Sequence, residues 1–454
     1  MEHVIGDYIF ESDKMIIFNK DIQEKKKENI LSSFDNTCKF QDEFDYLVSE
    51  ESKQKSFQYR IVQGAGIALS FNCGLRCNYC SQSSHEGMFE SITDEDIASF
   101  IKDIVFKKVI ASIAMKEPAA LSFYFTGGGE PTYNWERFKY AVLELERQCQ
   151  QKHVQLSLGM TTNGMLNEDQ IFFISEHFEK VLLSYDGLPA IQNDNRKTAS
   201  GKGTNDIVCN TLRRLIEKNV KVTIRTTIWQ DDFKYLFEMF DYISNNFVGL
   251  YSWDINPVTP AGRATEVMKV KSEQYKETDF FNAFLKLLKY SEHKNSYFRI
   301  TSPLLVSSPT GFNCGAAGPN IQTLWLLPNR KITTCIDSSD IITEVGCVKD
   351  GKINYYDEFE DPIYKMAIRK FEECRSCIAY RICAGGCPLK HIRALETKEG
   401  MLEWECLMQQ NFWKHILTET IKGESLWGWK ATQYTIEQEN VYLLQYTENT
   451  EIES

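Results

Sequence analysis

The sequence lacks any run of about 18 consecutive apolar residues, the length that an α-helix needs to cross a bilayer. Its first residues, MEHVIGDYIFESDK, also lack the basic start and apolar core of a secretory signal. We therefore expect no membrane span, no export, and a cytoplasmic location.

An excess of basic charge is missing as well. The chain has 51 Lys and Arg residues against 63 Asp and Glu residues, a formal net charge of −12. Non-specific binding to nucleic acid depends on basic charge, so we expect no nucleic-acid partner. The 454 residues are 43% hydrophobic and 25% charged, which suits a globular protein of two or three domains.

Cysteine, by contrast, is abundant. In a reducing compartment the fourteen cysteines are expected to be metal ligands or reactive thiols rather than disulfides. Three lie between positions 73 and 80, and eight lie between 314 and 406. The remaining three, Cys38, Cys149 and Cys209, are interpreted as plain buried thiols.

From residue 64 onward, apolar runs alternate with helical patterns. The strand-like runs are 66–71, 121–128, 154–164, 180–187, 221–228 and 250–258, and the helical patterns include 134–151, 203–219, 234–247 and 272–294. This alternation predicts parallel βαβ units that close fully or partly into a (β/α) barrel. Polar or glycine-rich residues follow the strands, and in such folds the carboxyl ends of the strands carry the active site.

The first strand leads into FNCGLRCNYC, which spaces Cys73, Cys77 and Cys80 as C-x3-C-x2-C. Tetrahedral zinc takes four ligands, and a cubane iron–sulfur cluster has four irons. Either a fourth protein ligand lies elsewhere or one coordination site is open. His85, five residues beyond the last cysteine, would complete a Cys3His zinc site, which is the alternative to a cluster.

The second strand leads into FYFTGGGEPT, in which three glycines precede Glu130. Glycines allow a polar ligand to approach the backbone closely. The loop lacks both the dinucleotide pattern and the Walker pattern, and a carboxylate beside the glycines suits an amine better than a phosphate. The alternative is a glycine-rich turn with a solvated glutamate.

Together, the three cysteines and the Gly-Gly-Glu-Pro loop resemble the radical S-adenosylmethionine (SAM) superfamily. Four further stretches resemble its SPASM branch, which carries an additional cysteine-rich domain: TTNG (161–164), SYDG (184–187), NDNRKTASGKG (193–203) and NPVTPAGRA (256–264). The resemblance covers about residues 64–410. It implies an α/β fold, a partial (β/α)6 TIM-like radical SAM barrel over 64–300 with a SPASM domain over 301–410 that binds auxiliary iron–sulfur clusters.

The resemblance also implies roles for individual residues. Cys73, Cys77 and Cys80 would hold a [4Fe–4S] cluster whose fourth iron chelates the amine and carboxylate of SAM. Contacts to SAM would come from Tyr79 at the adenine, Gly128, Gly129 and Glu130 at the amino group, Ser184 at the carboxylate or ribose, and Asn163 and Arg196 as further polar groups. A reductant such as flavodoxin or ferredoxin would supply the electron that cleaves SAM to methionine and a hydrogen-abstracting 5′-deoxyadenosyl radical.

The second cysteine set, CRSCIAYRICAGGCP, is close to a ferredoxin run. Its resemblance to SPASM domains implies two auxiliary [4Fe–4S] clusters and thus three clusters in all. One would use Cys374, Cys377, Cys383 and Cys406, and the other Cys314, Cys335 and Cys387. Residues 315–334 contain no further cysteine, so the fourth ligand of the second cluster would be Cys347, water or a substrate group. A zinc ribbon at 374–387 and Cys347 as a plain buried thiol are the alternatives.

Two positions depart from the family pattern. Arg330 stands where members often have glycine, five residues before Cys335. Sulfatase-maturing members carry an acidic residue directly after that cysteine, whereas this chain has Ile336 followed by Asp337. Asp337 is therefore a candidate catalytic base, with a solvated turn residue as the alternative.

The ends of the chain are harder to interpret. Residues 1–63 contain a hairpin pattern (7–19) and a charged helix pattern (21–34), and we consider them a candidate leader-peptide-binding module. Residues 411–454 read as a helix followed by a frayed acidic tail.

Three functional classes follow from these observations. The first is a radical SAM maturase that forms a thioether, carbon–carbon or ether crosslink in a ribosomally made precursor peptide. The second is another radical SAM protein-modifying oxidoreductase, including a formylglycine-generating sulfatase maturase. The third is a non-catalytic iron–sulfur electron-transfer protein, which the glycine–glutamate loop argues against.

Overall fold

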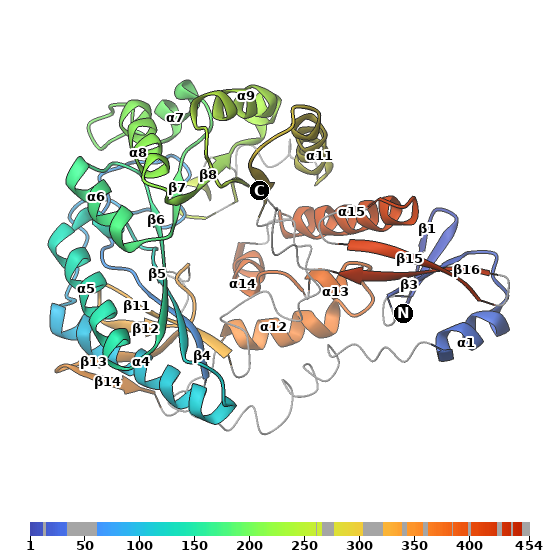
Figure 1. Cartoon of the computed structure of the whole chain (residues 1–454), viewed down its shortest axis with the longest axis horizontal. Coiled ribbons are helices and arrows are strands. Elements are labelled where there is room, and N and C mark those ends of the chain that lie inside the picture. Colours follow the sequence, from blue (N-terminus) through green and yellow to red (C-terminus); the bar gives the residue numbers. More distant parts are fainter. Residues whose placement is uncertain are drawn as a thin grey trace. The chain divides into compact units, whose positions relative to one another are not determined.

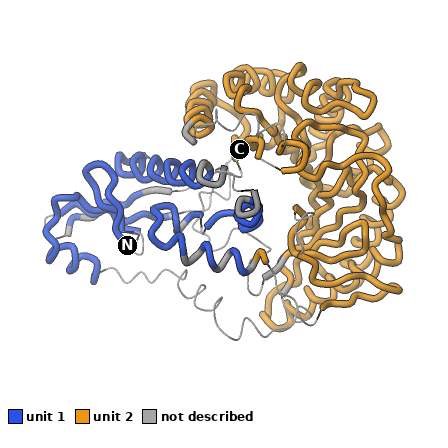
Figure 2. The backbone as a smooth tube through the Cα atoms, turned by 180° about the vertical axis from the view of Figure 1, so that it is seen from behind, with its two compact units in different colours: residues 1–53, 304–317, 364–454 blue, residues 54–303, 318–363 orange. Residues whose placement is uncertain are grey.

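The computed structural model describes residues 1–11, 15–33, 61–259, 261–265, 277–302, 321–337, 343–356, 362–383, 385–397, 401–424, 429–436 and 439–446. Cys38 and Cys314 lie outside these residues. The chain divides into two compact units (Figure 2): residues 1–53, 304–317 and 364–454 form unit 1, and residues 54–303 and 318–363 form unit 2. None of the described helices combines the length and apolarity needed to span a bilayer.

Unit 2 is built on the six predicted strands, which lie in sequence order in one parallel sheet (Figure 1). They are β4 (Ile61–Ile67), β5 (Ala120–Phe125), β6 (Gln155–Thr162), β7 (Lys180–Ser184), β8 (Lys221–Ile228) and β9 (Ser252–Pro257). Among the described strands, the two edges of this sheet do not pair with each other. Instead β4 pairs with β11 (Ile321–Leu326) and β9 pairs with β10 (Arg299–Thr301), both in parallel. The sequence-based prediction of a partial α/β barrel is confirmed.

Helices cover one face of this sheet. They are α4 (Asp94–Met115), α5 (Trp135–Gln151), α6 (Glu168–His177), α7 (Pro189–Asn195), α8 (Asn205–Glu217), α9 (Leu236–Asn246) and α11 (Glu277–His293), with short 3-10 turns η2 (Pro131–Tyr133) and η3 (Gln230–Tyr235). The helical pattern of α5 buries Phe138, Val142 and Leu145, which lie on one side of the helix. Phe138 packs 5.3 Å from Phe125 between ring centroids, so every second residue of β5 faces the helices.

The boundary expected at residue 300 differs from the observed division. Three antiparallel strands follow β11 and extend the unit 2 sheet: β12 (Lys331–Thr333), β13 (Glu344–Lys349) and β14 (Lys352–Tyr355). The open edge of β4 offers backbone donors and acceptors, and β11 uses them. Arg330, in the turn before β12, adopts φ +67°, which explains why glycine suits this position, and its Nε lies 2.8 Å from Asp96 Oδ2.

Unit 1 joins the two ends of the chain in a five-stranded antiparallel sheet. The N-terminal part supplies β1 (Glu2–Ile5), β2 (Tyr8–Glu11), β3 (Ile16–Asn19) and α1 (Glu24–Ser33). The C-terminal part supplies β15 (Trp429–Ile436) and β16 (Glu439–Tyr446), with β16 paired to β3. Its remaining helices are α12 (Pro362–Glu373), α13 (Tyr380–Cys383), α14 (Pro388–Thr397) and α15 (Met401–Ile421).

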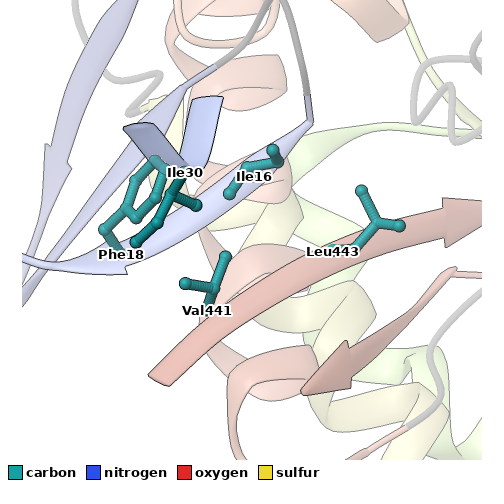
Figure 3. Close-up of a cluster of buried hydrophobic side chains, with 5 residues drawn as sticks. All are labelled: Ile16, Phe18, Ile30, Val441 and Leu443. Atoms are coloured by element: carbon teal, nitrogen blue, oxygen red, sulfur yellow. The ribbon is translucent and has the colours of Figure 1, made fainter. Parts of the chain in front are cut away.

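The hairpin and helix predicted near the N-terminus are therefore present, whereas the frayed tail was wrong for 429–446. The reason is a shared hydrophobic core. Ile16, Phe18 and Ile30 pack against Val441 and Leu443 of the C-terminal hairpin (Figure 3), and all five side chains are buried. Burial of these apolar side chains stabilises β15 and β16. The charged residues around these strands gave no indication of them in the sequence.

Candidate functional site

The cysteine loop follows β4 and is held by the segment after α7. Arg76 N donates to Lys197 O at 2.7 Å, Asn78 N donates to Asn195 O at 3.1 Å, and Ala199 N donates to Gly74 O at 3.0 Å. Cys73, Cys77 and Cys80 are all half-buried on this loop. Backbone bonds to a separate element thus fix the loop between its cysteines.

A buried ion pair lies behind the loop. Asp186, fully buried after β7, accepts hydrogen bonds from the Tyr79 hydroxyl, Arg196 Nε at 3.1 Å and Asn195 Nδ2 at 3.1 Å. The Arg196 guanidinium also stands 5.2 Å from the centroid of the Tyr79 ring. Burial above all raises the pKa of Tyr79, so the phenol keeps its proton and donates to the carboxylate.

A second basic residue binds the same loop from β9's C-terminal side. Arg263 Nε donates to Cys77 O at 2.8 Å, its backbone N donates to Cys80 O at 3.0 Å, and its Nη1 donates to Ser84 O at 3.1 Å. The preceding Gly262 has φ +54°, and a Cβ there would come within 2.3 Å of Cys80 O. The stretch NPVTPAGRA therefore lies directly against the cysteine loop.

The start of the loop is joined to the glycine loop after β5. Gly129 N donates to Ser70 O at 2.7 Å, and Glu130 N donates to Asn72 O at 2.9 Å. A Cβ on Gly129 would lie 1.9 Å from Asn72 O, and one on Gly128, at φ +63°, would lie 2.6 Å from Ser70 O. Both positions therefore require glycine for the two loops to meet.

The carboxylate of Glu130 is buried and held by neighbouring donors. Thr132 Oγ1 at 2.9 Å and Thr162 Oγ1 at 2.8 Å donate to Oε1, and Asn163 N donates to Oε2 at 2.8 Å. Burial raises the pKa of Glu130, and these hydrogen bonds oppose the rise. Glu130 is only 6% exposed, which excludes the alternative of a solvated glutamate.

The thiol of Cys73 faces the same group of residues. Its Sγ accepts from Leu75 N at 3.4 Å and from Asn163 Nδ2 at 3.8 Å. Burial, followed by the charge of Glu130, raises the pKa of Cys73 to about 12. A thiolate at this position therefore requires a cation, and bound iron would supply one.

The three thiols of Cys73, Cys77 and Cys80 form a donor set that fits an iron–sulfur cluster. Among the described residues, no group of three or more His, Cys, Asp or Glu side chains is arranged to hold one metal ion. In a cubane cluster each cysteine binds its own iron, so the ligand sulfurs stand apart. His85 contacts only the Ser83 carbonyl at 3.2 Å among its described hydrogen bonds, which gives the Cys3His zinc alternative no support.

Other candidate residues also come to this edge of the sheet. Gln82 Nε2, just beyond the cysteines, donates to Asp337 Oδ1 at 3.2 Å. A Cβ on Gly127 would lie 2.0 Å from Ile336 Cγ1, so residues 336–337 lie against the glycine loop. Ser184 is the last residue of β7 and is half-buried.

The second cysteine set lies mostly in unit 1. Cys374, Cys377, Cys383 and Cys406 are half-buried there. Burial, followed by the neighbouring thiols, raises the pKa of Cys383 to about 12 and of Cys406 to about 11. These four thiols are therefore near enough to influence one another's charge.

The remaining cysteines of that set are divided. Cys387 is exposed in unit 1, whereas Cys335 and Cys347 are half-buried in unit 2. Cys347 lies in the middle of β13, opposite Lys331 and Asn354. Cys149 and Cys209 are plain buried thiols, at 2% and 3% exposure, as expected.

Three residues of the site were not identified from the sequence. Glu90 Oε1 accepts from Phe71 N at 2.7 Å and from Asn72 Nδ2 at 2.6 Å, which fixes the start of the cysteine loop. Asp186 and Arg263 fix its middle and end. Asp186 lies in SYDG and Arg263 in NPVTPAGRA, two stretches that the sequence analysis had singled out. Their hydrogen-bond partners, however, can be identified only in the fold.

Comparisons with known proteins agree with this site. The family model of the Radical SAM superfamily matches residues 67–242. The cysteine-type anaerobic sulfatase-maturating enzyme of Clostridium perfringens is 22% identical over 377 residues, which cover 78% of this chain and 95% of that protein.

Two solved structures share the fold. The structure of anSMEcpe with bound AdoMet and Cp18Cys peptide has a TM-score of 0.61 at 20% identity and covers 80% of this chain and 98% of its own. Streptococcus suis SuiB bound to precursor peptide SuiA has a TM-score of 0.51 at 15% identity and covers 87% and 97%. The matched residues 67–242 contain the cysteine, glycine and Asp186 loops, so this part of the chain is a radical SAM domain and the protein is an enzyme.

Proposed function

We propose that this enzyme is a peptide maturase that abstracts a hydrogen from a side chain or backbone position of a ribosomally made precursor peptide and forms a thioether, carbon–carbon or ether crosslink. The observation that carries the proposal is the joined pair of loops: the three-cysteine loop and the buried Glu130 meet at the carboxyl edge of an open sheet, with Asp337 beside them. The similarity to SuiB bound to its precursor peptide supports a peptide as substrate.

When bound, a [4Fe–4S] cluster and SAM supply the one-electron chemistry and the hydrogen-abstracting radical. Cys73, Cys77 and Cys80 are the residues we assign to the cluster. For SAM we assign Gly128, Gly129, Glu130, Asn163 and Ser184, because these groups surround the Cys73 thiol or end the neighbouring strands.

Glu130 suits an ammonium group because its carboxylate is already oriented and desolvated. Three donors fix its position, and a charge-assisted bond to an amine would compensate its burial. For Tyr79 and Arg196 we propose a positioning role beside the SAM contacts that the resemblance implied. Their polar groups are engaged by Asp186, so we assign both to holding the cluster loop.

We further propose two auxiliary [4Fe–4S] clusters. The mutual influence of Cys374, Cys377, Cys383 and Cys406 supports the first. The second would use Cys314, Cys335 and Cys387, with Cys347, water or the substrate as its fourth ligand. Iron counts of Cys347→Ala protein distinguish these choices, because only a ligand's removal lowers the iron content.

A formylglycine-generating sulfatase maturase is the second candidate. The C. perfringens relative with that name covers 78% of this chain, and Asp337 lies beside the cysteine loop, where a base would act. The displacement of this acid by one position, with Ile336 directly after Cys335, favours the crosslinking maturase.

The N-terminal segment is our proposed leader-binding module, with one constraint. The outer edge of β3 is occupied by β16, through the pairs Phe18–Val441 and Leu443–Ile16. A leader strand therefore has β1 or β15 as an available edge, or it displaces the C-terminal hairpin. Deletion of 1–60 should abolish leader binding while the barrel keeps its cluster; unchanged affinity excludes the module.

The deciding experiment uses anaerobically reconstituted protein with SAM, dithionite and a short precursor peptide encoded next to the gene. A crosslinking maturase releases 5′-deoxyadenosine and converts the peptide to a product lacking two hydrogens, with a new bond located by tandem mass spectrometry. Formylglycine in a Cys- or Ser-containing sulfatase peptide would favour the second candidate. Reducible clusters without any 5′-deoxyadenosine would indicate the electron-transfer protein and overturn both. In the cell, flavodoxin or ferredoxin is the reductant we propose.

A further inference from the structure

The face of the unit 2 sheet that is turned away from the helices carries two aromatic rings in one row. Trp325 on β11 pairs with Gly66 on β4, Gly66 pairs with Tyr124 on β5, and Tyr124 pairs with Gly159 on β6. Large and small residues thus alternate across four neighbouring strands.

Each ring lies over a glycine. A Cβ on Gly66 would come within 2.2 Å of Trp325 Cζ3, and a Cβ on Gly159 would come within 2.6 Å of Tyr124 Cε1. Glycine inside a strand costs stability and commonly marks a close approach of another group. The two rings cover the backbone of the glycines, which accounts for their position. It does not account for their exposure to solvent.

The rings remain accessible. Tyr124 is 48% exposed and Trp325 is half-buried, whereas Phe123 and Phe125, on the opposite face of the same strand, are fully buried. The adjacent row on the open face carries small hydroxyl residues, and Ser122 there is exposed. The open face therefore offers flat apolar surface beside hydroxyl donors and acceptors.

This aromatic pair lies close to the glycine loop of the candidate site. Tyr124 is one residue from the end of β5 and Gly128 follows it by four residues, so their Cα atoms lie at most about 14 Å apart. That length corresponds to a few residues of an extended peptide. A peptide whose reacting residue reached the glycine loop would thus have a neighbouring side chain over the rings.

We propose that Trp325 and Tyr124 form a subsite that binds an aromatic side chain of the peptide substrate near the residue to be modified. The inference rests on the proposed function and specifies the substrate class. Aromatic rings prefer offset or edge-to-face contact with other rings, which a branched aliphatic side chain does not match. The hydroxyl row suits the polar peptide backbone on either side of that ring.

The test compares N-acetyl-L-tyrosinamide with N-acetyl-L-leucinamide on reconstituted protein with SAM, by saturation-transfer NMR titration. We expect the tyrosine probe to bind about 2- to 12-fold more tightly. Tyr124→Leu and Trp325→Leu should each remove this preference. Tyr251→Leu is the matched control, because Tyr251 is similarly exposed, at 42%, and precedes β9.

Gly159→Ala provides a second variant that keeps both rings. The three atoms nearest its Cβ would all belong to the Tyr124 ring, so the ring must turn and the preference should fall while the melting temperature stays unchanged. Equal binding of both probes to the wild type, or a preference that survives both Leu variants, overturns the subsite.

The two proposals can fail separately. Formation of 5′-deoxyadenosine and of a crosslinked peptide without any aromatic preference rejects the subsite and retains the maturase. An aromatic preference lost in the Leu variants, together with an unmodified precursor peptide, retains the subsite and rejects the crosslinking function.

Discussion

The two cysteine-bearing regions of this enzyme both crowd thiols into a short stretch, but they are supported differently. The loop of Cys73–Cys80 is bonded through its backbone to residues 195–199 and to Arg263, and a buried ion pair lies behind it. In the described part of 374–387 the backbone bonds are mainly local, such as Cys377 N to Cys374 O at 2.8 Å. The first region is therefore shaped by the protein, whereas the second depends more on whatever binds its thiols.

The difference suggests separate tasks. A site that must admit SAM to an open iron benefits from a loop that keeps its shape when the ligand leaves. An auxiliary cluster with a complete set of protein ligands can itself act as the crosslink that holds its surroundings. We therefore infer that a loop is held by the protein where its cluster exchanges a ligand during turnover, and by the cluster itself where all ligands come from the protein.

Removal of iron should separate the two regions most strongly. For small structural metal sites the binding free energy, on the order of 10 kcal/mol, is largely folding free energy. We expect chelation under anaerobic conditions to raise hydrogen exchange much more in residues 374–387 than in residues 73–80. Exchange followed by mass spectrometry checks this, and equal loss of protection in both would contradict the difference in support.

The second prediction concerns the buried ion pair behind the loop of Cys73–Cys80. Asp186→Asn leaves Arg196 buried without its counter-charge, and removing one partner of a buried pair costs about 3–5 kcal/mol. Asp194→Asn is the control, because its pair with Lys197 at 2.8 Å is exposed and its loss should change stability by less than about 1 kcal/mol.

Urea unfolding of the reconstituted proteins measures both variants, and the EPR signal of the cluster shows whether the loop keeps its iron. A stable Asp186→Asn protein with an unchanged EPR signal would show that the ion pair is not needed to hold the loop.

The fold was largely predictable because strand and helix periods are local. The run 221–228 matched β8 at both ends, and 180–187 matched β7 apart from its last three residues. The strands β15 and β16 were missed because their stability comes from Ile16 and Phe18, more than 400 residues away in the sequence. Alternation in a charged tail does not reveal such a partner.

The candidate site was predictable to a similar limit. Spacing and strand-end position located the cysteines, the glycines and Glu130, because those residue types have few other uses in that order. The role of Asp186 was not predictable, because it depends on donors from two separate segments, one that carries Tyr79 and one that carries Asn195 and Arg196. Asp337 was a candidate from the sequence, and its contact with Gln82 appears only in the fold.

The third prediction tests the contact between the cysteine and glycine loops. Gly129→Ala would place a Cβ 1.9 Å from the Asn72 carbonyl oxygen, and such overpacking costs about 1–3 kcal/mol. We expect weaker SAM binding as the two loops separate, measured as a smaller SAM-induced change in the EPR signal. Gly74→Ala is the control within the cysteine loop, because nothing lies within 4 Å of its added Cβ; an equal effect of both variants would reject the contact as the cause.

The smallest effect distinguishes a plain buried thiol from ligand thiols. Burial raises the pKa of Cys149 to about 11 from 9.0, so the folded state holds this proton more tightly than the unfolded state. The stability it contributes is complete below pH 9 and is lost as the pH rises through 11, at a limiting slope of about 1.4 kcal/mol per pH unit between these values. We therefore expect the stability advantage of the wild type over Cys149→Ala, from urea unfolding, to shrink by about 1 kcal/mol between pH 8 and pH 10.

Iron content should be equal in both proteins at each pH. A loss of iron in Cys149→Ala would instead place this thiol among the ligands and remove the contrast with the two cysteine-bearing regions.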